Sequence, residues 1–413
     1  MPSRCRFCRS ELADTVVDLG LSPVSNEFRD AAFADERPQT FYPLKAMVCR
    51  NCWLVQLSEV ETPEHFDADY VYFSSYSTSW LEHSKGYATR MIDMLGLDGT
   101  AQVVEIASND GYLLQYFKQA GIPVLGVEPS ANVAEHARKA HGIETIDAFF
   151  GRECAARLVA QGVKADLMAA NNVLAHVPDI NDFVAGFALL LRHGGTITFE
   201  FPHLLNTLRL CQFDTIYHEH FSYLSLGVVE RILGAHGLEA YGVEEIPTHG
   251  GSLRVYAGHR GGCRQEPALH ATLERLRVDE AEFGLETLAP YGDFSRAVGR
   301  RKTEFLGFLI EAAAEGKKVL GYGAPAKGNT MLNYCGIGPE LLAYTVDMSP
   351  HKQGHLLPGV NIPVHAPDRL LADRPDYIVI LPWNLRDEIA VQLAEARDWG
   401  CRFVVAIPEL EVF

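Results

Sequence analysis

Four cysteines near the start of the chain form two pairs with the spacing of metal ligands. Cys5 and Cys8 make one CxxC unit, and Cys49 and Cys52 make a second. A CxxC turn presents two thiolates to one side of a metal, and zinc prefers four soft ligands in a tetrahedron. Because four thiolates leave no position open for water, we predict a structural zinc site; redox dithiols or unrelated thiols are the alternatives.

A strand-to-helix turn, VVEIASNDGYLL, has features of a nucleotide-type binding site. Glu105 lies near the strand end, and Gly111 is the only glycine of the turn, so the GxGxxG pattern of pyrophosphate sites is absent. Ser108, Asn109 and Asp110 supply polar side chains instead. S-adenosylmethionine has no phosphate and carries an ammonium group. Acidic and amide groups suit that cation, so we predict that this turn binds S-adenosylmethionine.

Acidic and amide residues follow the next strands in order. Glu128 ends one strand and could accept hydrogen bonds from both ribose hydroxyls, and Asp147 could approach the adenine. Asn171 and Asn172 end the following strand, where the reacting methyl group should lie, because ligands collect at the carboxyl ends of parallel strands. Each residue alone could be a turn or cap residue, but the ordered set favours a methyltransferase. The predicted cofactor-binding residues are Glu105, Ala107, Asn109, Gly111, Tyr112, Leu113, Glu128, Pro129, Asp147, Asn171 and Asn172.

Two later segments carry groups suited to acid–base chemistry. One is NNVLAHVPDI, with His176, and the other is DTIYHEHFSYLS, with Tyr217, Glu219 and His220. Histidine is a natural general base because its ordinary pKa of about 6.5 lies near cellular pH. Glutamate can orient a histidine, and tyrosine can hydrogen-bond an oxyanion. In an extended segment alternate residues project together, and no third ligand is evident for a metal; structural histidines are the alternative.

Two further segments could bind a substrate. DADYVYFSSYSTSW offers Tyr72 and Ser75, whose groups suit either the face of a sugar or a domain junction. VLGYGAPAKGNTMLNY places glycines around a second strand-to-helix turn, with Lys327 and Asn329. Backbone amides at a helix N-terminus bind anions and a lysine adds charge, so a diphosphate is the predicted ligand. An empty loop or a nicotinamide cofactor is the alternative.

Hydrophobic periodicity indicates the elements that hold these residues. A helix over 78–96 precedes short apolar strands that alternate with amphipathic helices, which is typical of a doubly wound parallel sheet. LEAYGVEEIP and GSLRVYAGH are predicted to form a hairpin that completes this sheet. Residues 1 to about 70 are predicted to be irregular. Helix formers dominate residues 264–315, and strand–helix alternation restarts at 317.

The resulting prediction is an α/β protein of three domains. A Rossmann-like class I methyltransferase domain occupies residues 76–262. It lies between a small zinc-binding domain over 1–75 and a C-terminal Rossmann-like α/β domain over 263–413.

Composition narrows the class of protein. The net charge of −17 argues against an extended nucleic-acid surface, which needs clustered lysine and arginine. No apolar run approaches the roughly 20 residues that cross a bilayer, and the start MPSRCRFCRS has no apolar signal core. We therefore expect a cytoplasmic protein without a membrane or nucleic-acid partner. The sequence gives no indication of the oligomeric state.

The order of the motifs resembles the sugar C-methyltransferases, which install branches on deoxysugars of bacterial antibiotics. The paired CxxC units, EIASNDGYLL, YHEHFSYLS, HGGSLRVY and GYGAPAKGN follow one another over nearly the whole chain. The resemblance implies a zinc-binding N-terminal domain, a central domain that binds S-adenosylmethionine, and a C-terminal α/β domain. It also implies a nucleotide-linked keto-deoxysugar substrate, commonly one carried by thymidine diphosphate.

The resemblance also implies roles for individual residues. The family's catalytic segment falls on Tyr217, Glu219 and His220, with His176 nearby. His220 would remove the proton beside the sugar ketone, Tyr217 or His176 would stabilise the enolate oxygen, and the enolate carbon would take the methyl group. Tyr72 would contact the sugar. Binding of the diphosphate by Lys327 is inferred from charge and loop shape.

Three other functions stay open at this point. An O- or N-methyltransferase on the same fold would need a nucleophilic hydroxyl or amine instead of an enolisable ketone. A nucleotide-sugar or nicotinamide oxidoreductase would use the C-terminal glycine loop. A non-catalytic binding protein with a zinc module would not depend on His220.

Overall fold

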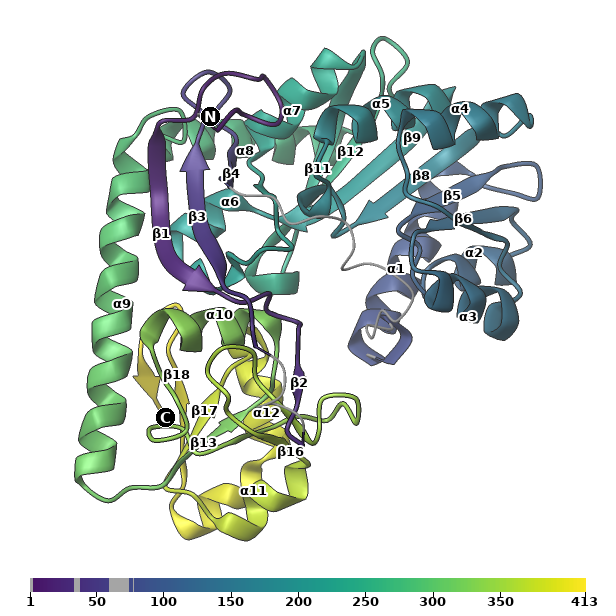
Figure 1. Ribbon diagram of the computed structural model, residues 1–413. Helices are drawn as coiled ribbons and strands as arrows, with labels where there is room; N and C mark the ends of the chain where they lie inside the picture. The colour runs from purple at the N-terminus through teal and green to yellow at the C-terminus, as the bar shows by residue number, and fades with distance from the viewer. Residues whose placement is uncertain (1–2, 33–37, 59–73, 77) are drawn as a thin grey trace.

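The computed structural model describes residues 3–32, 38–58, 74–76 and 78–413 (Figure 1). Tyr72, a predicted substrate contact, lies outside these residues. Figure 1 shows the N-terminal sheet beside the large central sheet, with the C-terminal domain below them. Among the helices that the structure describes, none is long and apolar enough to cross a membrane.

The central sheet has seven strands in the order β11-β12-β9-β8-β5-β6-β7. β5 to β9 run parallel, and the predicted hairpin β11–β12 adds two antiparallel strands at one edge. The order reverses at β5, because β6 and β7 extend to one side and β8 and β9 to the other. The loops at the carboxyl ends of β5 and β8 therefore diverge and leave a crevice for a ligand. The strands are β5 (Val103–Ile106), β6 (Val124–Glu128), β7 (Thr145–Asp147), β8 (Ala165–Asn171), β9 (Leu191–Pro202), β11 (Leu238–Ile246) and β12 (Ser252–His259).

Helices cover both faces of this sheet because alternate strand residues point to opposite sides. Val104 and Met168 belong to the core beneath α4, α5 and α7, whereas Val103 and Leu167 belong to the core beneath α1 and α2. The helices of this domain are α1 (Thr78–Leu95), α2 (Leu114–Gln119), α3 (Ala131–His141), α4 (Arg152–Ala160), α5 (Ile180–Leu190), α6 (Leu204–Arg209), α7 (Leu226–Ala235) and α8 (Pro267–Phe283).

The N-terminal region is more regular than the sequence predicted. β1 (Asp14–Ser22), β3 (Tyr42–Val48), β4 (Val55–Leu57) and β10 (Ser222–Tyr223) form an antiparallel sheet in the order β1-β3-β4-β10. The prediction of irregular structure was wrong because these strands are short and their partners are distant in sequence. β10 comes from the central part of the chain, and β1 packs against the long helix α9 (Ala289–Ala314).

The C-terminal domain contains a six-stranded sheet in the order β16-β14-β13-β17-β18-β19, parallel except for β19. Helix α9 runs beside the N-terminal sheet and continues along this domain (Figure 1). A further pairing, β2 with β15, joins the N-terminal segment to it. The elements are β2 (Arg29–Asp30), β13 (Val319–Tyr322), α10 (Ala326–Cys335), β14 (Thr345–Val346), β15 (His355–Leu356), β16 (Val364–His365), α11 (Pro367–Asp373), β17 (Tyr377–Ile380), α12 (Arg386–Gln392), β18 (Arg402–Val405) and β19 (Glu411–Val412).

A buried charge network stabilises the edge of the central sheet that carries β12. The guanidinium of Arg254, which is 1% exposed, donates hydrogen bonds to the carboxylates of Glu200 at 2.7 Å and Glu244 at 3.1 Å. Burial alone would raise the pKa of Glu200, but His83 and Arg254 bring it down to about 2. Glu200 is therefore ionised, and its buried negative charge is compensated by the guanidinium of Arg254.

We predict that Arg254→Met destabilises the protein by on the order of 3–5 kcal/mol, because it leaves the buried Glu200 carboxylate uncompensated. Urea unfolding followed by circular dichroism measures the change. Arg296→Met is the matched control, since Arg296 pairs with Asp293 on an exposed helix surface and should contribute about 1 kcal/mol or less. Equal stability of the two variants would show that the network contributes little.

Candidate active site

A cavity of about 660 Å³ lies at the carboxyl ends of the central parallel strands. The loops after β5, β6 and β8 form one side of it. The turn that leads into β10, the β11–β12 turn and the N-terminus of α10 form the other. The N-terminal segment contributes Asn26 and the C-terminal domain contributes Lys327 and Lys352. All three parts of the chain therefore meet at this cavity.

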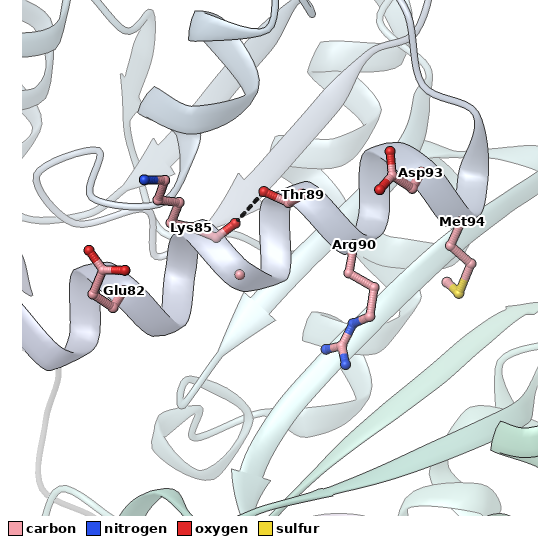
Figure 2. A pocket seen from close by; sticks show the side chains of 7 residues that line it. Glu82, Lys85, Thr89, Arg90, Asp93 and Met94 are labelled. Carbon is pink, nitrogen blue, oxygen red and sulfur yellow. Dashed lines mark hydrogen bonds between the residues drawn. The ribbon is translucent and has the colours of Figure 1, made fainter.

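A second depression lies along the surface of α1 (Figure 2). Figure 2 shows Glu82, Lys85, Thr89, Arg90, Asp93 and Met94 on this one helix, with the Thr89 hydroxyl donating to the Lys85 carbonyl. It is a shallow, open groove, and it contains none of the predicted site residues.

The turn after β5 is held in a conformation that few residues adopt. Ala107 and Asn109 have φ values of 54° and 49°, in the left-handed region that residues with a side chain rarely occupy. Gly111, at φ 83°, has no room for a side chain, because a Cβ there would lie 2.6 Å from Ile143 Cδ1. Glu128 fixes the turn from the next strand, since its carboxylate accepts from the Asn109 amide at 3.0 Å and the Ser130 amide at 2.9 Å.

This turn is strongly acidic. Glu105 is fully buried, and the Tyr112 hydroxyl is the group that faces its carboxylate. Burial and the nearby charges of Asp110 and Glu128 hold the pKa of Glu105 well above its usual range. A cationic group in the adjacent cavity would stabilise these carboxylates, so the turn fits the ammonium of S-adenosylmethionine.

Seven predicted cofactor residues line the cavity: Ala107, Asn109, Tyr112, Glu128, Pro129, Asn171 and Asn172. Glu105, Gly111 and Leu113 are buried and shape the turn without lining the cavity. Asp147 does not lie where the sequence placed it. It is exposed at the end of β7, which has only three residues, and the next residues, Ala148 to Phe150, line the cavity instead.

The predicted catalytic segment is a tight turn and not an extended strand. It follows the 3-10 helix η5 (Phe213–Thr215), and the His220 amide bonds the Tyr217 carbonyl at 2.9 Å. The His220 Nδ1–H donates to the Thr215 carbonyl at 2.8 Å, because a carbonyl can only accept. In the neutral ring Nε2 therefore carries the lone pair, and it accepts from the Tyr217 hydroxyl at 2.8 Å.

His176 joins this pair, as predicted. Its ring lies edge-on to the His220 ring, with centroids 4.6 Å apart. Burial lowers the pKa of His176 to about 4, and burial together with His176 holds the pKa of His220 well below its usual range. Both rings are therefore neutral near pH 7, so His220 is in its basic form.

Glu219 and Asn26 connect the N-terminal segment to this turn. The Asn26 side-chain amide donates to Glu219 Oε1 at 2.7 Å, and both residues line the cavity. The sequence did not suggest Asn26, Trp80, His249 or Lys352, which also line the cavity. Only the HGG sequence around His249 could have drawn attention to one of them.

The C-terminal domain reaches the turn through Trp383, whose indole N–H donates to Asp214 Oδ2 at 2.7 Å. Burial raises the pKa of Asp214 to about 6. Lys327 lies over the Trp383 ring, 5.0 Å from its centroid, and bonds Asn384 Oδ1 at 2.6 Å. A cation therefore lies at this end of the cavity.

Two predicted substrate residues do not line the cavity. Asn329 is buried within α10, where its side-chain oxygen accepts from Asn333 at 3.2 Å. Ser75 bonds Asp110 through its backbone amide at 3.1 Å, and its neighbour Ser74 lines the cavity instead.

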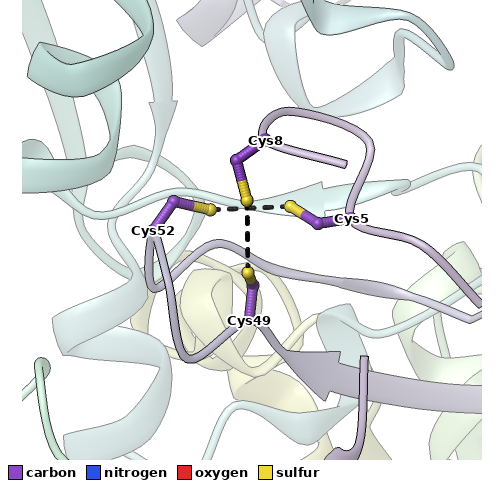
Figure 3. A group of neighbouring side chains, drawn as sticks. All are labelled: Cys5, Cys8, Cys49 and Cys52. Carbon is purple, nitrogen blue, oxygen red and sulfur yellow. Dashed lines mark hydrogen bonds between the residues drawn. The ribbon is translucent and has the colours of Figure 1, made fainter. Parts of the chain in front are cut away.

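The four N-terminal cysteines converge on one point (Figure 3). Cys5 and Cys52 have sulfur atoms 3.5 Å apart, as do Cys8 and Cys49, and all four sulfurs lie within 4.8 Å of one another. Tetrahedral zinc with Zn–S bonds of about 2.3 Å requires sulfurs roughly 3.8 Å apart. The residues therefore fit a closed, structural zinc site.

The zinc site is connected to the Tyr217–His220 turn through the N-terminal sheet. Strand β10 begins two residues after His220 and pairs with β4. The Phe221 carbonyl accepts from the Leu57 amide at 3.1 Å, and the Arg6 guanidinium lies 5.3 Å from the centre of the Phe221 ring. Zinc held by these cysteines would therefore stabilise the sheet from which the Tyr217–His220 turn projects.

The fold and this site define a class I methyltransferase, and comparison with known proteins agrees. Family models match in order: a zinc binding domain over 5–66, a methyltransferase domain over 80–242 and a C-methyltransferase C-terminal domain over 247–408. C-methyltransferase NovU of Streptomyces niveus is 34% identical over 408 residues, covering 99% of this chain and 96% of the relative. The chain belongs to the C-methyltransferase family that includes NovU.

Solved structures resemble the central part of the chain. Magnesium protoporphyrin IX methyltransferase from Synechocystis PCC 6803, with bound SAM, is 17% identical at a TM-score of 0.33, covering 46% of this chain and 85% of its own. An S-adenosylmethionine-dependent methyltransferase from Clostridium acetobutylicum ATCC 824 is 9% identical at a TM-score of 0.35, covering 43% and 92%.

The family models and the similarity to NovU confirm the predicted enzyme class and the zinc-binding domain. Methyltransferases of this class take the methyl group from S-adenosylmethionine.

We predict that Cys49→Ser removes zinc and lowers the rate of methyl transfer more than tenfold, because metal binding supplies folding energy to the sheet behind His220. Affinity for S-adenosylhomocysteine, measured by calorimetry, should change less than about threefold, since Tyr112 and Leu113 of the β5 turn pack in a different core from the cysteines. Cys263→Ser, the same change at a half-buried thiol outside the cluster, is the control. Full activity in zinc-free Cys49→Ser would contradict the predicted dependence of methyl transfer on the zinc site.

Proposed function

We propose that this enzyme transfers a methyl group from S-adenosylmethionine to the carbon beside the ketone of a nucleotide-linked deoxysugar, one carried by thymidine diphosphate. The observation that supports this most is the orientation of His220. Its Nε2 lone pair, set by the Thr215 carbonyl, lies in the same cavity as the acidic β5 turn. A base beside a cofactor site is what carbon methylation through an enolate requires.

The β5 side of the cavity would hold the cofactor. The acidic turn around Glu105 would attract the ammonium, and Glu128 has lone pairs left for the ribose hydroxyls after accepting its two backbone amides. Ala148, Phe149 and Phe150 offer the apolar surface that adenine needs, in place of Asp147. When bound, S-adenosylmethionine supplies a sulfonium methyl that a carbon nucleophile can attack in line.

The Tyr217–His220 pair would remove the proton. In the free protein the Tyr217 hydroxyl donates a hydrogen bond to the Nε2 lone pair of His220. We infer a relay: the hydroxyl takes the proton from the carbon beside the ketone as it gives its own to Nε2. The C–H electron pair becomes the C=C bond of an enolate, and the charge moves to the ketone oxygen. Glu219 and His176 hold the turn in place for this step.

The C-terminal domain would bind the diphosphate. Lys327 and Lys352 both line the cavity, and they supply positive charge opposite the acidic turn. Lys327 stands at the start of α10, where backbone amides also favour an anion. Asn329 would act inside α10 and not on the substrate. Tyr72, as the resemblance implies, and Ser75 would contact the sugar.

We further propose that the enzyme works in the cytoplasm. All nine cysteines are free thiols in the structure, and a reducing compartment keeps zinc-binding thiols in that state.

Incubation with methyl-labelled S-adenosylmethionine and a panel of thymidine- and guanosine-diphosphate ketosugars tests the substrate class. We expect label on a thymidine diphosphate ketosugar, at the carbon next to the ketone in the product's NMR spectrum. The matching sugars with the ketone reduced to a hydroxyl are the control and should take no label, because they cannot form an enolate. Label on an oxygen or nitrogen would identify an O- or N-methyltransferase instead.

The pH dependence of kcat/KM tests the base. Protonation of Nε2 abolishes the base, so activity is lost as the pH falls through the pKa of His220 in the free enzyme. Because burial and His176 hold that pKa well below its usual range, kcat/KM should stay level from pH 8 down past pH 6.5.

His220→Asn should lower kcat by roughly 10²–10⁴-fold, whereas His193→Gln, which changes a histidine that does not line the cavity, should have no such effect. An acid limb centred above about pH 6.5, or an active His220→Asn enzyme, would exclude His220 as the base.

A further inference from the structure

His249 occupies a backbone conformation that a histidine rarely adopts. It lies in the 3-10 turn η6 (Thr248–Gly250) between β11 and β12, with φ 56° and ψ 21°. A residue with a side chain pays a cost in this left-handed region, and such strain persists only where the surrounding structure enforces it. Strained residues of this kind cluster at functional sites.

The surrounding structure enforces this conformation through the two glycines that follow. A Cβ on Gly250 would lie 2.5 Å from the Trp383 ring, and one on Gly251 would collide with Asn206. The Gln212 side-chain amide also donates to the Gly250 carbonyl at 2.7 Å. The turn is therefore held from the central domain and the C-terminal domain together, and His249 is presented at a defined position.

The His249 side chain lies in the cavity wall and is exposed to the cavity. Trp80 is edge-on to it, with ring centroids 5.8 Å apart. Neither ring nitrogen makes a hydrogen bond to any residue that the structure describes. Enclosure in the cavity and the charge of Lys327 lower the pKa of His249 to about 4. The ring is therefore neutral near pH 7 and has one N–H to donate.

The enolate oxygen needs such a donor, and the two residues that the resemblance implied for this role, Tyr217 and His176, are already engaged. The single Tyr217 proton is directed to His220 Nε2. His176 is hydrogen-bonded to the backbone of Glu219. All three histidines line the cavity, and the rings of His176 and His220 lie with their centroids 4.6 Å apart.

We propose that His249 is a further catalytic residue, whose neutral imidazole N–H donates a hydrogen bond to the substrate ketone oxygen as it becomes the enolate oxygen. This inference rests on the proposed function. A neutral imidazole suits this task because it stabilises the developing charge without passing its proton to the oxygen, which would quench the carbon nucleophile. The electron pair therefore stays available to form the carbon–methyl bond.

Two substitutions at His249 distinguish the effect of the imidazole from an effect of the backbone conformation of the turn. His249→Gly removes the imidazole at a position whose φ suits glycine, so the turn should keep its shape. His249→Asn keeps an N–H donor on a residue that adopts the left-handed region more readily than most. Thermal unfolding of both variants checks that the fold is retained.

The measurement is exchange of the hydrogen beside the ketone with D₂O, using a thymidine diphosphate keto-deoxysugar and S-adenosylhomocysteine in place of the methyl donor. We expect His249→Gly to slow exchange and methyl transfer by about 10²–10³-fold. KM and the calorimetric affinity for S-adenosylhomocysteine should change less than about threefold, because the donor acts mainly on the developing oxyanion. The exchange and methyl-transfer rates of His249→Asn should be at least tenfold higher than those of His249→Gly.

Exchange by His249→Gly within about threefold of the parent enzyme would overturn this proposal. So would weakened S-adenosylhomocysteine binding with a normal exchange rate at saturation, which would make His249 a cofactor contact. A parent enzyme that neither exchanges nor methylates any ketosugar in the panel would overturn the proposed function itself.

Discussion

The hydrogen bond from His220 Nδ1 to the Thr215 carbonyl determines what the cavity can do. It selects the tautomer of the imidazole and leaves the lone pair on Nε2. Without it the ring could turn its N–H toward the cavity and would be a donor instead of a base. Burial also favours the basic form of the ring, because it holds the pKa of His220 well below its usual range and keeps the imidazole neutral.

Each of the three parts of the chain holds this hydrogen bond in place from a different side. The N-terminal sheet anchors the segment after His220 through the pairing of β10 with β4, and zinc stabilises that sheet. The C-terminal domain anchors the segment before it, because Trp383 bonds Asp214, the neighbour of Thr215. The central domain supplies His176. A turn without regular structure of its own is thus held by contacts from all three parts of the chain.

The electrostatics of the cavity divide it between two ligands. Glu105, Asp110 and Glu128 place three carboxyl groups in and beside the turn after β5, where burial raises the pKa of Glu105, whereas the C-terminal domain contributes Lys327 and Lys352 to the cavity. A cationic cofactor suits the carboxyl groups, and the anionic substrate that we propose would suit the lysines. In the proposed reaction their reacting atoms would meet in this cavity, which His176, His220 and His249 also line. Positioning of this kind supplies much of the rate enhancement in a group transfer.

Local sequence determined those features that depend on neighbouring residues. The spacing of the CxxC units is enough to predict a zinc site, because two residues between cysteines place both thiolates on one metal. Alternating apolar strands and amphipathic helices predict the parallel sheet, and polar residues at strand ends predict most of the cofactor side. The tight turn at Tyr217–His220 was predicted as extended, because no local signal distinguishes the two.

Only the tertiary structure decided which distant residues complete the site. Asn26, Trp80, His249 and Lys352 lie far apart in the sequence, and no periodicity links them. The N-terminal sheet likewise depends on β10, a two-residue strand that has no stability until its partner is present. Asp147 and Asn329 do not line the cavity, because packing sets the direction of a side chain at the end of a short element. Residue types and short spacings are local properties, whereas hydrogen-bond partners and tautomers depend on contacts between distant segments.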